Sequence, residues 1–294
     1  MPSWEGKSRG GSFGHRFFIF LIRTFGVRFA YFFLLFVVVH FIPFAPLATK
    51  SNWHYFRKIK RYGIAKTVMY LYLNYYRFGQ VIIDKVAIRS GLEKQYNYEF
   101  EQYDEFLRLL NGNTGVIIIG AHIGNWEIGS SFFGDYQGTL NMVMYDAEYR
   151  EIKEVLEHTL KETNYRVIPI ADNSLEHIYQ IKTALDNREC ICFQGDRFIS
   201  DKSSVVVDFL GCPAKFPLGP FLLSSKYRVP VVFYFSMREK GMTYRFKFCV
   251  ADTSRKENGE RPEHLLLKQY VNALEETINQ YPEQWFNYYN FWNV

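Results

Sequence analysis

The chain has 294 residues, enough for one large domain or two small ones, and 48% of them are hydrophobic. Aromatic residues make up 19% of the chain, with 28 Phe and 22 Tyr, which is rich for a soluble protein and suits a membrane–water boundary. The net charge of +5 favours an anionic surface or substrate without identifying it, and the chain has no Walker A motif, Rossmann glycine fingerprint or internal repeat.

The amino-terminal region predicts a membrane anchor. Residues 17–44 are apolar with few interruptions, and the cleanest part, residues 29–44, is shorter than the ~20 residues needed to span a bilayer. One tilted span and a helix lying in the interface therefore both remain open. Basic residues are more numerous after this segment than before it, so a spanning helix would leave the rest of the chain cytoplasmic. A cleaved signal peptide is disfavoured, because the apolar region is too long and contains two arginines.

Residues 53–90 combine basic and aromatic side chains at helical spacing. This pattern predicts one or two amphipathic helices against an anionic membrane surface, with core packing as the simpler explanation of the aromatic stripe. A nucleic-acid surface is the alternative, and the adjacent apolar segment favours the membrane. We therefore expect residues 1–48 to form a tail and anchor, and residues 49–294 to form a catalytic domain that includes this region.

Strand and helix patterns alternate through the rest of the chain. A helix is expected over residues 100–110 and another from about Asn125, with later helices over 148–163, 175–185 and 264–279 and one beginning near Leu218. Strands are expected over residues 116–120, 140–145, 165–170, 191–193 and 204–210, with a turn over 211–215. This alternation predicts an α/β fold with a mostly parallel central sheet flanked by helices.

The turn after residues 116–120 contains the best candidate for a catalytic pair. His122 and Glu127 would point about 140° apart on a continuous helix, so they meet only if the chain bends between them. Gly124 permits such a bend. A carboxylate touching one imidazole nitrogen fixes the tautomer and leaves the other nitrogen free to accept a proton. Open α/β sheets bind ligands at the carboxyl ends of their strands, which is where this pair lies.

Other chemistries fit this turn less well. The chain has no HExxH pattern to support zinc binding at His122, and no G-x-S-x-G motif of a serine hydrolase. The four cysteines do not have the spacing of a structural zinc site and are expected to be reduced thiols. A purely structural histidine, with Glu127 complementing a helix dipole, is the plainest alternative.

The segment GAHIGNWE resembles the H-x4-D/E block of the lysophospholipid acyltransferase superfamily, in the H-x-G-N-W-E form of the lipid A late acyltransferases. Two further segments resemble later blocks of that family and occur in the same order, so the resemblance covers most of the chain. With GAHIGNWE as the first block, the second block contains Asp196, Ser204, Val205, Phe209, Gly211 and Gly219. The third block, residues 281–292, includes Pro282 and Trp285 and resembles a P-x-Q-W segment, to which we assign packing and no catalytic role.

The resemblance implies a glycerol-3-phosphate acyltransferase-like fold and acyl transfer from a thioester, on acyl carrier protein or coenzyme A, to a hydroxyl of a lipid acceptor. His122 would be the general base and Glu127 its orienting partner. Backbone N–H groups at Gly124 would stabilise the oxyanion, and Asn125 would hold the turn. The other substrate-binding candidates are Asp196, Arg197 and Lys215, the last two as partners of a phosphate. No cofactor, metal or nucleic acid is expected.

Late acylation of lipid A is the first expectation for the reaction, at the cytoplasmic face of the inner membrane. An aminolipid, a glycolipid or a pigment precursor is the alternative acceptor. The Asn-Pro signature often found in lipid A enzymes is missing between Asn141 and Arg150, and the FPEGT-type block of glycerol-phosphate acyltransferases is also missing. A hydrolase using the same base and a catalytically silent lipid-binding protein remain as alternatives of other classes.

Overall fold

The computed structural model describes residues 12–128, 136, 138–145, 165–171, 174–197, 204–254 and 259–292. The helix expected over residues 148–163 and the tail before residue 12 lie outside this description. The helix expected from about Asn125 is described only as a short 3-10 turn at residues 126–128.

A seven-stranded sheet forms the centre of the described structure, in the order β1-β9-β8-β2-β5-β3-β4. Neighbouring strands run parallel except β8 and β9, which are antiparallel. The mostly parallel sheet expected from the sequence is therefore confirmed. The bounds of these strands are β1 (Asn97–Glu101), β2 (Val116–Gly120), β3 (Leu140–Tyr145), β4 (Tyr165–Ile170), β5 (Cys190–Gln194), β8 (Val231–Arg238) and β9 (Thr243–Val250).

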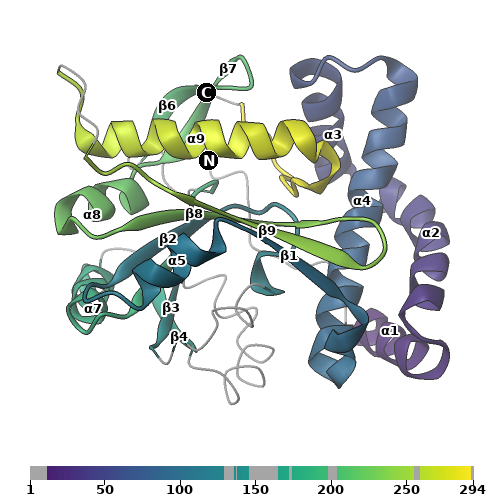
Figure 1. The fold of residues 1–294 in the computed structure, drawn as a ribbon. Helices are drawn as coiled ribbons and strands as arrows, with labels where there is room; N and C mark the ends of the chain where they lie inside the picture. Colours follow the sequence, from purple (N-terminus) through teal and green to yellow (C-terminus); the bar gives the residue numbers. More distant parts are fainter. Residues whose placement is uncertain are drawn as a thin grey trace.

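The central strand β2 is buried along its whole length. Its β-branched residues suit a strand covered on both faces, and burial of each isoleucine contributes about 1.5–3 kcal/mol. In Figure 1, helix α9 (Pro262–Gln280) lies above β8 and β9, α8 (Gly219–Tyr227) lies at the left, and α5 (Tyr103–Leu110) lies below β8 and β9. Helix α7 (Glu176–Asp186) connects β4 to β5. This layered order brings the carboxyl ends of β2, β5 and β8 to one edge of the sheet.

The amino-terminal helices stack beside the β1–β9 side of the sheet (Figure 1). They are α1 (Ser12–Phe25), α2 (Val27–Phe44), α3 (Pro46–His54) and α4 (Ile64–Ala87), with a π-helical turn η1 (Tyr55–Ile59) after α3 and another, η2 (Ile88–Leu92), after α4. One side of α2 packs against α4, burying Ala30, Leu34 and Val38, while Phe29, Phe32 and Phe36 are exposed. The apolar helix predicted from the sequence is therefore present, and one of its faces packs against α4.

Two local expectations were wrong, and two strands were not anticipated. Residues 97–101 form the edge strand β1, because they alternate in burial and pair with β9, and the left-handed residue Gln102 then separates this strand from α5. The turn expected around Lys215 is instead the strand β7 (Cys212–Pro217), which pairs with β6 (Ser204–Phe209) in a separate hairpin. Strands β8 and β9 were not anticipated, although their aromatic and β-branched residues are typical of strands.

Candidate active site

The turn that follows β2 is held by backbone hydrogen bonds to two distant segments. The N–H of Gly124 donates to the carbonyl of Gln284 at 2.9 Å, and the N–H of Asn125 donates to the carbonyl of Ser236 at 2.8 Å. Gly124 has φ of +57°, and a Cβ there would lie 1.8 Å from the Ser236 oxygen, so only glycine fits. The bend expected at Gly124 is confirmed.

His122 points at Asp196, which follows the neighbouring strand β5. Nδ1 of His122 lies 2.7 Å from Oδ1 of Asp196, and the backbone N–H of His122 donates to Oδ2 at 2.9 Å. The strand register explains this meeting, because Gly120 pairs with Gln194 and each functional residue lies two positions further on. The side chain of His122 is 13% exposed and that of Asp196 only 2%.

Two aromatic residues of the carboxyl-terminal segment hold Asp196 in place. Nε1–H of Trp285 donates to Oδ2 at 3.1 Å, and the hydroxyl of Tyr289 donates to the backbone carbonyl of Asp196 at 2.9 Å. Burial by itself raises the pKa of a carboxyl group, but the His122 side chain and backbone and the charge of Arg197 hold the pKa of Asp196 below its ordinary value. Asp196 is therefore an ionised acceptor for an imidazole N–H on Nδ1.

The carboxylate that orients His122 in this structure is thus Asp196, and the orienting contact expected from Glu127 was wrong. Glu127 lies at the 3-10 turn and its carboxylate pairs with Lys85 of α4 at 2.6 Å and with Arg89 of η2 at 3.4 Å. Burial acts to raise the pKa of Glu127, but Lys85 and Arg89, with a smaller contribution from His122, lower it below the ordinary value. Glu127 therefore adds a negative charge near His122 without being its hydrogen-bond partner.

The other expected site residues divide into two groups. Both Asn125 and Gly124 were expected to bind substrate, but Asn125 is fully buried and Gly124 is buried, so in this structure they shape the turn, the second role expected of Asn125. The N–H groups of Gly124 and Asn125 already have acceptors within the protein, so these two groups are not free to stabilise an oxyanion. Arg197 donates to the carbonyl of Phe286 at 3.3 Å, and Lys215 lies on β7, in the hairpin that is separate from the central sheet.

Sequence reasoning missed Lys85, Arg89 and the two aromatic donors to Asp196. The aromatic donors belong to the third block, which was expected only to pack, and Trp285 does pack in full burial against Tyr55 and Phe209. The signal for the cations was the basic character of residues 53–90. In the ranges that the structure describes, no group of three or more metal-ligating side chains could hold a metal ion.

The arrangement can perform general-base catalysis. An aspartate bound at Nδ1 keeps the proton there and directs the lone pair of Nε2 outward, and it stabilises the imidazolium that forms when Nε2 takes a proton. Among the described residues, none donates or accepts a hydrogen bond at Nε2. A hydroxyl group brought to this nitrogen would be activated as a nucleophile.

Comparisons with known proteins show which family the sequence resembles. Residues 71–293 match the family model described as bacterial lipid A biosynthesis acyltransferase. The phosphatidylinositol mannoside acyltransferase of Mycobacterium tuberculosis is 21% identical over 133 residues, in each of two strains, and the aligned part covers 45% of this chain and 42% of that protein. The crystal structure of the 1-acyl-sn-glycerophosphate acyltransferase PlsC from Thermotoga maritima is similar at 14% identity and a TM-score of 0.40, over 88% of this chain and 99% of PlsC.

Proposed function

The chain belongs to the bacterial lipid A biosynthesis acyltransferase family, and from this membership we propose that it transfers a fatty acyl chain from an acyl thioester to a hydroxyl group of a lipid. The observation that supports the reaction best is the His122–Asp196 pair, with Nδ1 held at 2.7 Å by a buried carboxylate. The donor is acyl carrier protein or coenzyme A, whose thioesters are already activated, so an enzyme nucleophile is not required.

The proposed mechanism uses His122 twice. Nε2 removes the proton of the acceptor hydroxyl as that oxygen attacks the thioester carbonyl, forming the new C–O bond. Collapse of the tetrahedral intermediate breaks the C–S bond, and the imidazolium returns its proton to the departing thiolate. Asp196 holds the ring and stabilises its positive charge between these steps. Glu127 keeps Lys85 and Arg89 beside the site, where their charges favour an anionic group of the donor or acceptor.

The acceptor we propose first is a hydroxyl on an acyl chain of a lipid A precursor, because the family model is described by lipid A biosynthesis. A glycolipid is the second candidate, supported by the resemblance to the mannoside acyltransferase over 45% of this chain. An aminolipid or a pigment precursor is a less supported acceptor.

We propose that the protein acts at the cytoplasmic face of the inner membrane. Helix α2, with 18 residues, is the candidate membrane helix within the described residues by length and hydropathy. Because one face of α2 packs on α4 and the opposite face exposes Phe29, Phe32 and Phe36, we favour a helix lying in the interface over one that crosses the bilayer. The catalytic turn would then stay close to a membrane-embedded acceptor.

Lipid mass spectrometry tests this function. Total lipids are compared between the native host, a strain lacking the gene and a strain carrying His122→Ala. We expect one lipid class to lose a single acyl chain in both altered strains, and the lost chain identifies the acceptor. Lipids that change on deletion but not in the His122→Ala strain would support a silent lipid-binding protein. Release of free fatty acid by the purified enzyme in the presence of its acceptor would support a hydrolase.

A further inference from the structure

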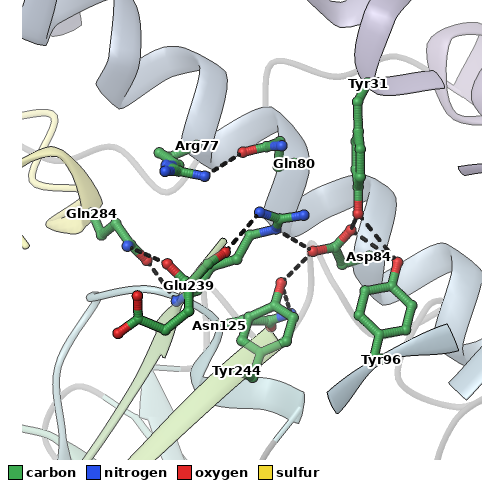
Figure 2. Close-up of polar contacts among 10 residues, drawn as sticks. Tyr31, Arg77, Gln80, Asp84, Tyr96, Asn125, Glu239, Tyr244 and Gln284 are labelled. Carbon is green, nitrogen blue, oxygen red and sulfur yellow. Dashed lines mark hydrogen bonds and ion pairs between the residues drawn. The ribbon is translucent and has the colours of Figure 1, made fainter. Parts of the chain in front are cut away.

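Asp84 of α4 lies outside the pair that performs the proposed chemistry, and it is completely buried. Figure 2 shows the hydroxyls of Tyr31, Tyr96 and Tyr244 converging on its carboxylate, and the guanidinium of Arg238 is the fourth group that donates to it. The donors come from α2, from the residue before β1, from β9 and from β8. One carboxylate therefore joins the amino-terminal helices to the adjacent side of the sheet, formed by β1, β9 and β8.

The carboxylate of Asp84 accepts two hydrogen bonds on each oxygen. Oδ1 accepts from Tyr31 and, at 3.0 Å, from Tyr96. Oδ2 accepts from Tyr244 and from Nε of Arg238, the latter at 2.9 Å. Burial raises the pKa of all three phenols, and the charge of Asp84 raises it further, so they remain donors at neutral pH.

A cluster of this kind is not explained by stability alone. The desolvation of a buried ion pair cancels much of its attraction, and well-packed apolar residues often serve as well for stability. Fully bonded polar networks do, however, specify one arrangement of the elements that they join. The question is therefore which arrangement this cluster specifies.

Two routes of hydrogen bonds lead from Asp84 to the turn that carries His122. In the first, Nδ2 of Asn125 donates to the hydroxyl of Tyr244 at 3.4 Å, and that hydroxyl donates to Asp84. This is the step drawn in Figure 2 between Asn125 and Tyr244. Both residues are 0% exposed, so water does not replace the contact.

The second route passes through Arg238 and Gln284. The backbone N–H of Arg238 donates to Oε1 of Gln284 at 2.8 Å, and Nε2 of Gln284 donates to the Arg238 carbonyl at 2.7 Å. The carbonyl of Gln284 in turn accepts from the N–H of Gly124 at 2.9 Å. The two routes thus reach adjacent residues of the same turn.

We propose that Asp84 and Tyr244 are positioning residues for His122: the buried carboxylate holds Tyr244, and Tyr244 holds the Asn125 side chain and with it the catalytic turn. The catalytic consequence rests on the proposed role of His122 as general base, whereas the ordering of the turn does not. Through Tyr31 the same carboxylate also binds α2, so the membrane-facing helix and the catalytic turn share one anchor.

Tyr244→Phe and Tyr96→Phe form a matched pair of variants. Each removes one phenol donor from Asp84 and leaves the aromatic ring, but only Tyr244 touches Asn125. Hydrogen–deuterium exchange of the full chain is followed at the amides of Gly124 and Asn125, relative to the amides of β2. Exchange at the turn should rise about ten-fold in Tyr244→Phe, the effect of losing roughly one net hydrogen bond, and should stay within two-fold in Tyr96→Phe.

Kinetics supply the second readout. With an acyl-coenzyme A donor and membranes from the deletion strain as acceptor, we expect Tyr244→Phe to lower kcat about ten-fold with KM unchanged, because the base is misplaced while substrate binding is intact. Equal exchange at the turn in both variants, or no change in either, would overturn the proposal. If exchange at the turn rose in Tyr244→Phe but the wild type transferred no acyl chain, the proposed function would be refuted and the positioning role of Tyr244 would stand.

A variant of the turn itself covers the case in which Tyr244→Phe does not fold. Asn125→Ala removes the amide and leaves all four donors on Asp84. It should give the same rise in exchange and the same fall in kcat. Wild-type exchange at Gly124 in this variant would overturn the proposal.

Discussion

Replacing Asp196 by Asn should nearly abolish acyl transfer while preserving the size of the side chain. Asp196 accepts three hydrogen bonds, from Nδ1 of His122 at 2.7 Å, from the His122 backbone at 2.9 Å and from Trp285 at 3.1 Å. An amide NH₂ in place of Oδ1 would face the imidazole N–H, so the ring would change tautomer and direct a proton, not a lone pair, at the substrate.

The size of the effect follows from serine-hydrolase chemistry. The corresponding Asp-to-Asn change in a Ser-His-Asp triad lowers kcat by about 10⁴-fold, which is about 5 kcal/mol of transition-state stabilisation. A thioester needs less activation of the attacking group, so we expect a loss between about 10²-fold and 10⁴-fold here. Transfer from an acyl-coenzyme A donor to membranes of the deletion strain gives kcat, and circular dichroism checks the fold.

Glu127→Gln is the matched control, because it removes the other carboxylate near His122. Its partners are Lys85 and Arg89, so we expect a loss of about ten-fold, from weaker electrostatic support of the imidazolium. If Glu127→Gln abolished transfer while Asp196→Asn kept more than a tenth of the activity, the assignment of Asp196 as the orienting carboxylate would be refuted.

Three further predictions concern the turn, acid stability and the membrane. Gly124→Ala should lower the free energy of unfolding by more than about 3 kcal/mol in chemical denaturation, because its Cβ would lie 1.8 Å from the Ser236 oxygen, whereas Gly211→Ala, with nothing within 4 Å, should cost only about 1–2 kcal/mol. Similar losses in both would contradict the clash. The pKa of Asp196 is lowered in the folded state, so its stabilising effect is present above its unfolded pKa of about 3.9 and is lost as the pH falls through the lower, folded value. The difference in Tm between wild type and Asp196→Asn should therefore be constant near neutral pH and shrink only below about pH 4; a difference that shrank already near pH 6 would argue against this carboxylate. Replacing Phe29, Phe32 and Phe36, which are exposed on α2, by serine should weaken binding to lipid vesicles in a flotation assay without unfolding the protein. Unchanged flotation would refute the anchor.

The sequence alone predicted the elements that depend on short runs of neighbouring residues. The β-branched run at residues 116–119 predicted the strand β2, and His122, Gly124 and Glu127 predicted the turn after it. The strands β3 and β4 were placed with the bounds that the structure has, because short apolar runs between turn residues have few alternatives. Where two patterns competed, at residues 97–110, the pairing of β1 with β9 decided the outcome.

The sequence by itself determined that His122 follows a buried strand at a glycine bend, that a second block with Asp196 follows another strand, and that an apolar helix precedes both. Only the tertiary structure decided which carboxylate faces the imidazole. Glu127 is five positions away along the chain and turns toward α4, whereas Asp196 is 74 positions away and is brought opposite His122 by the parallel pairing of β2 with β5. Side-chain periodicity describes one element at a time, and the order and register of strands depend on how whole elements bury their faces against one another. For the same reason the Asp84 cluster could not be predicted from the sequence, because its donors lie as far as 160 positions from Asp84 along the chain.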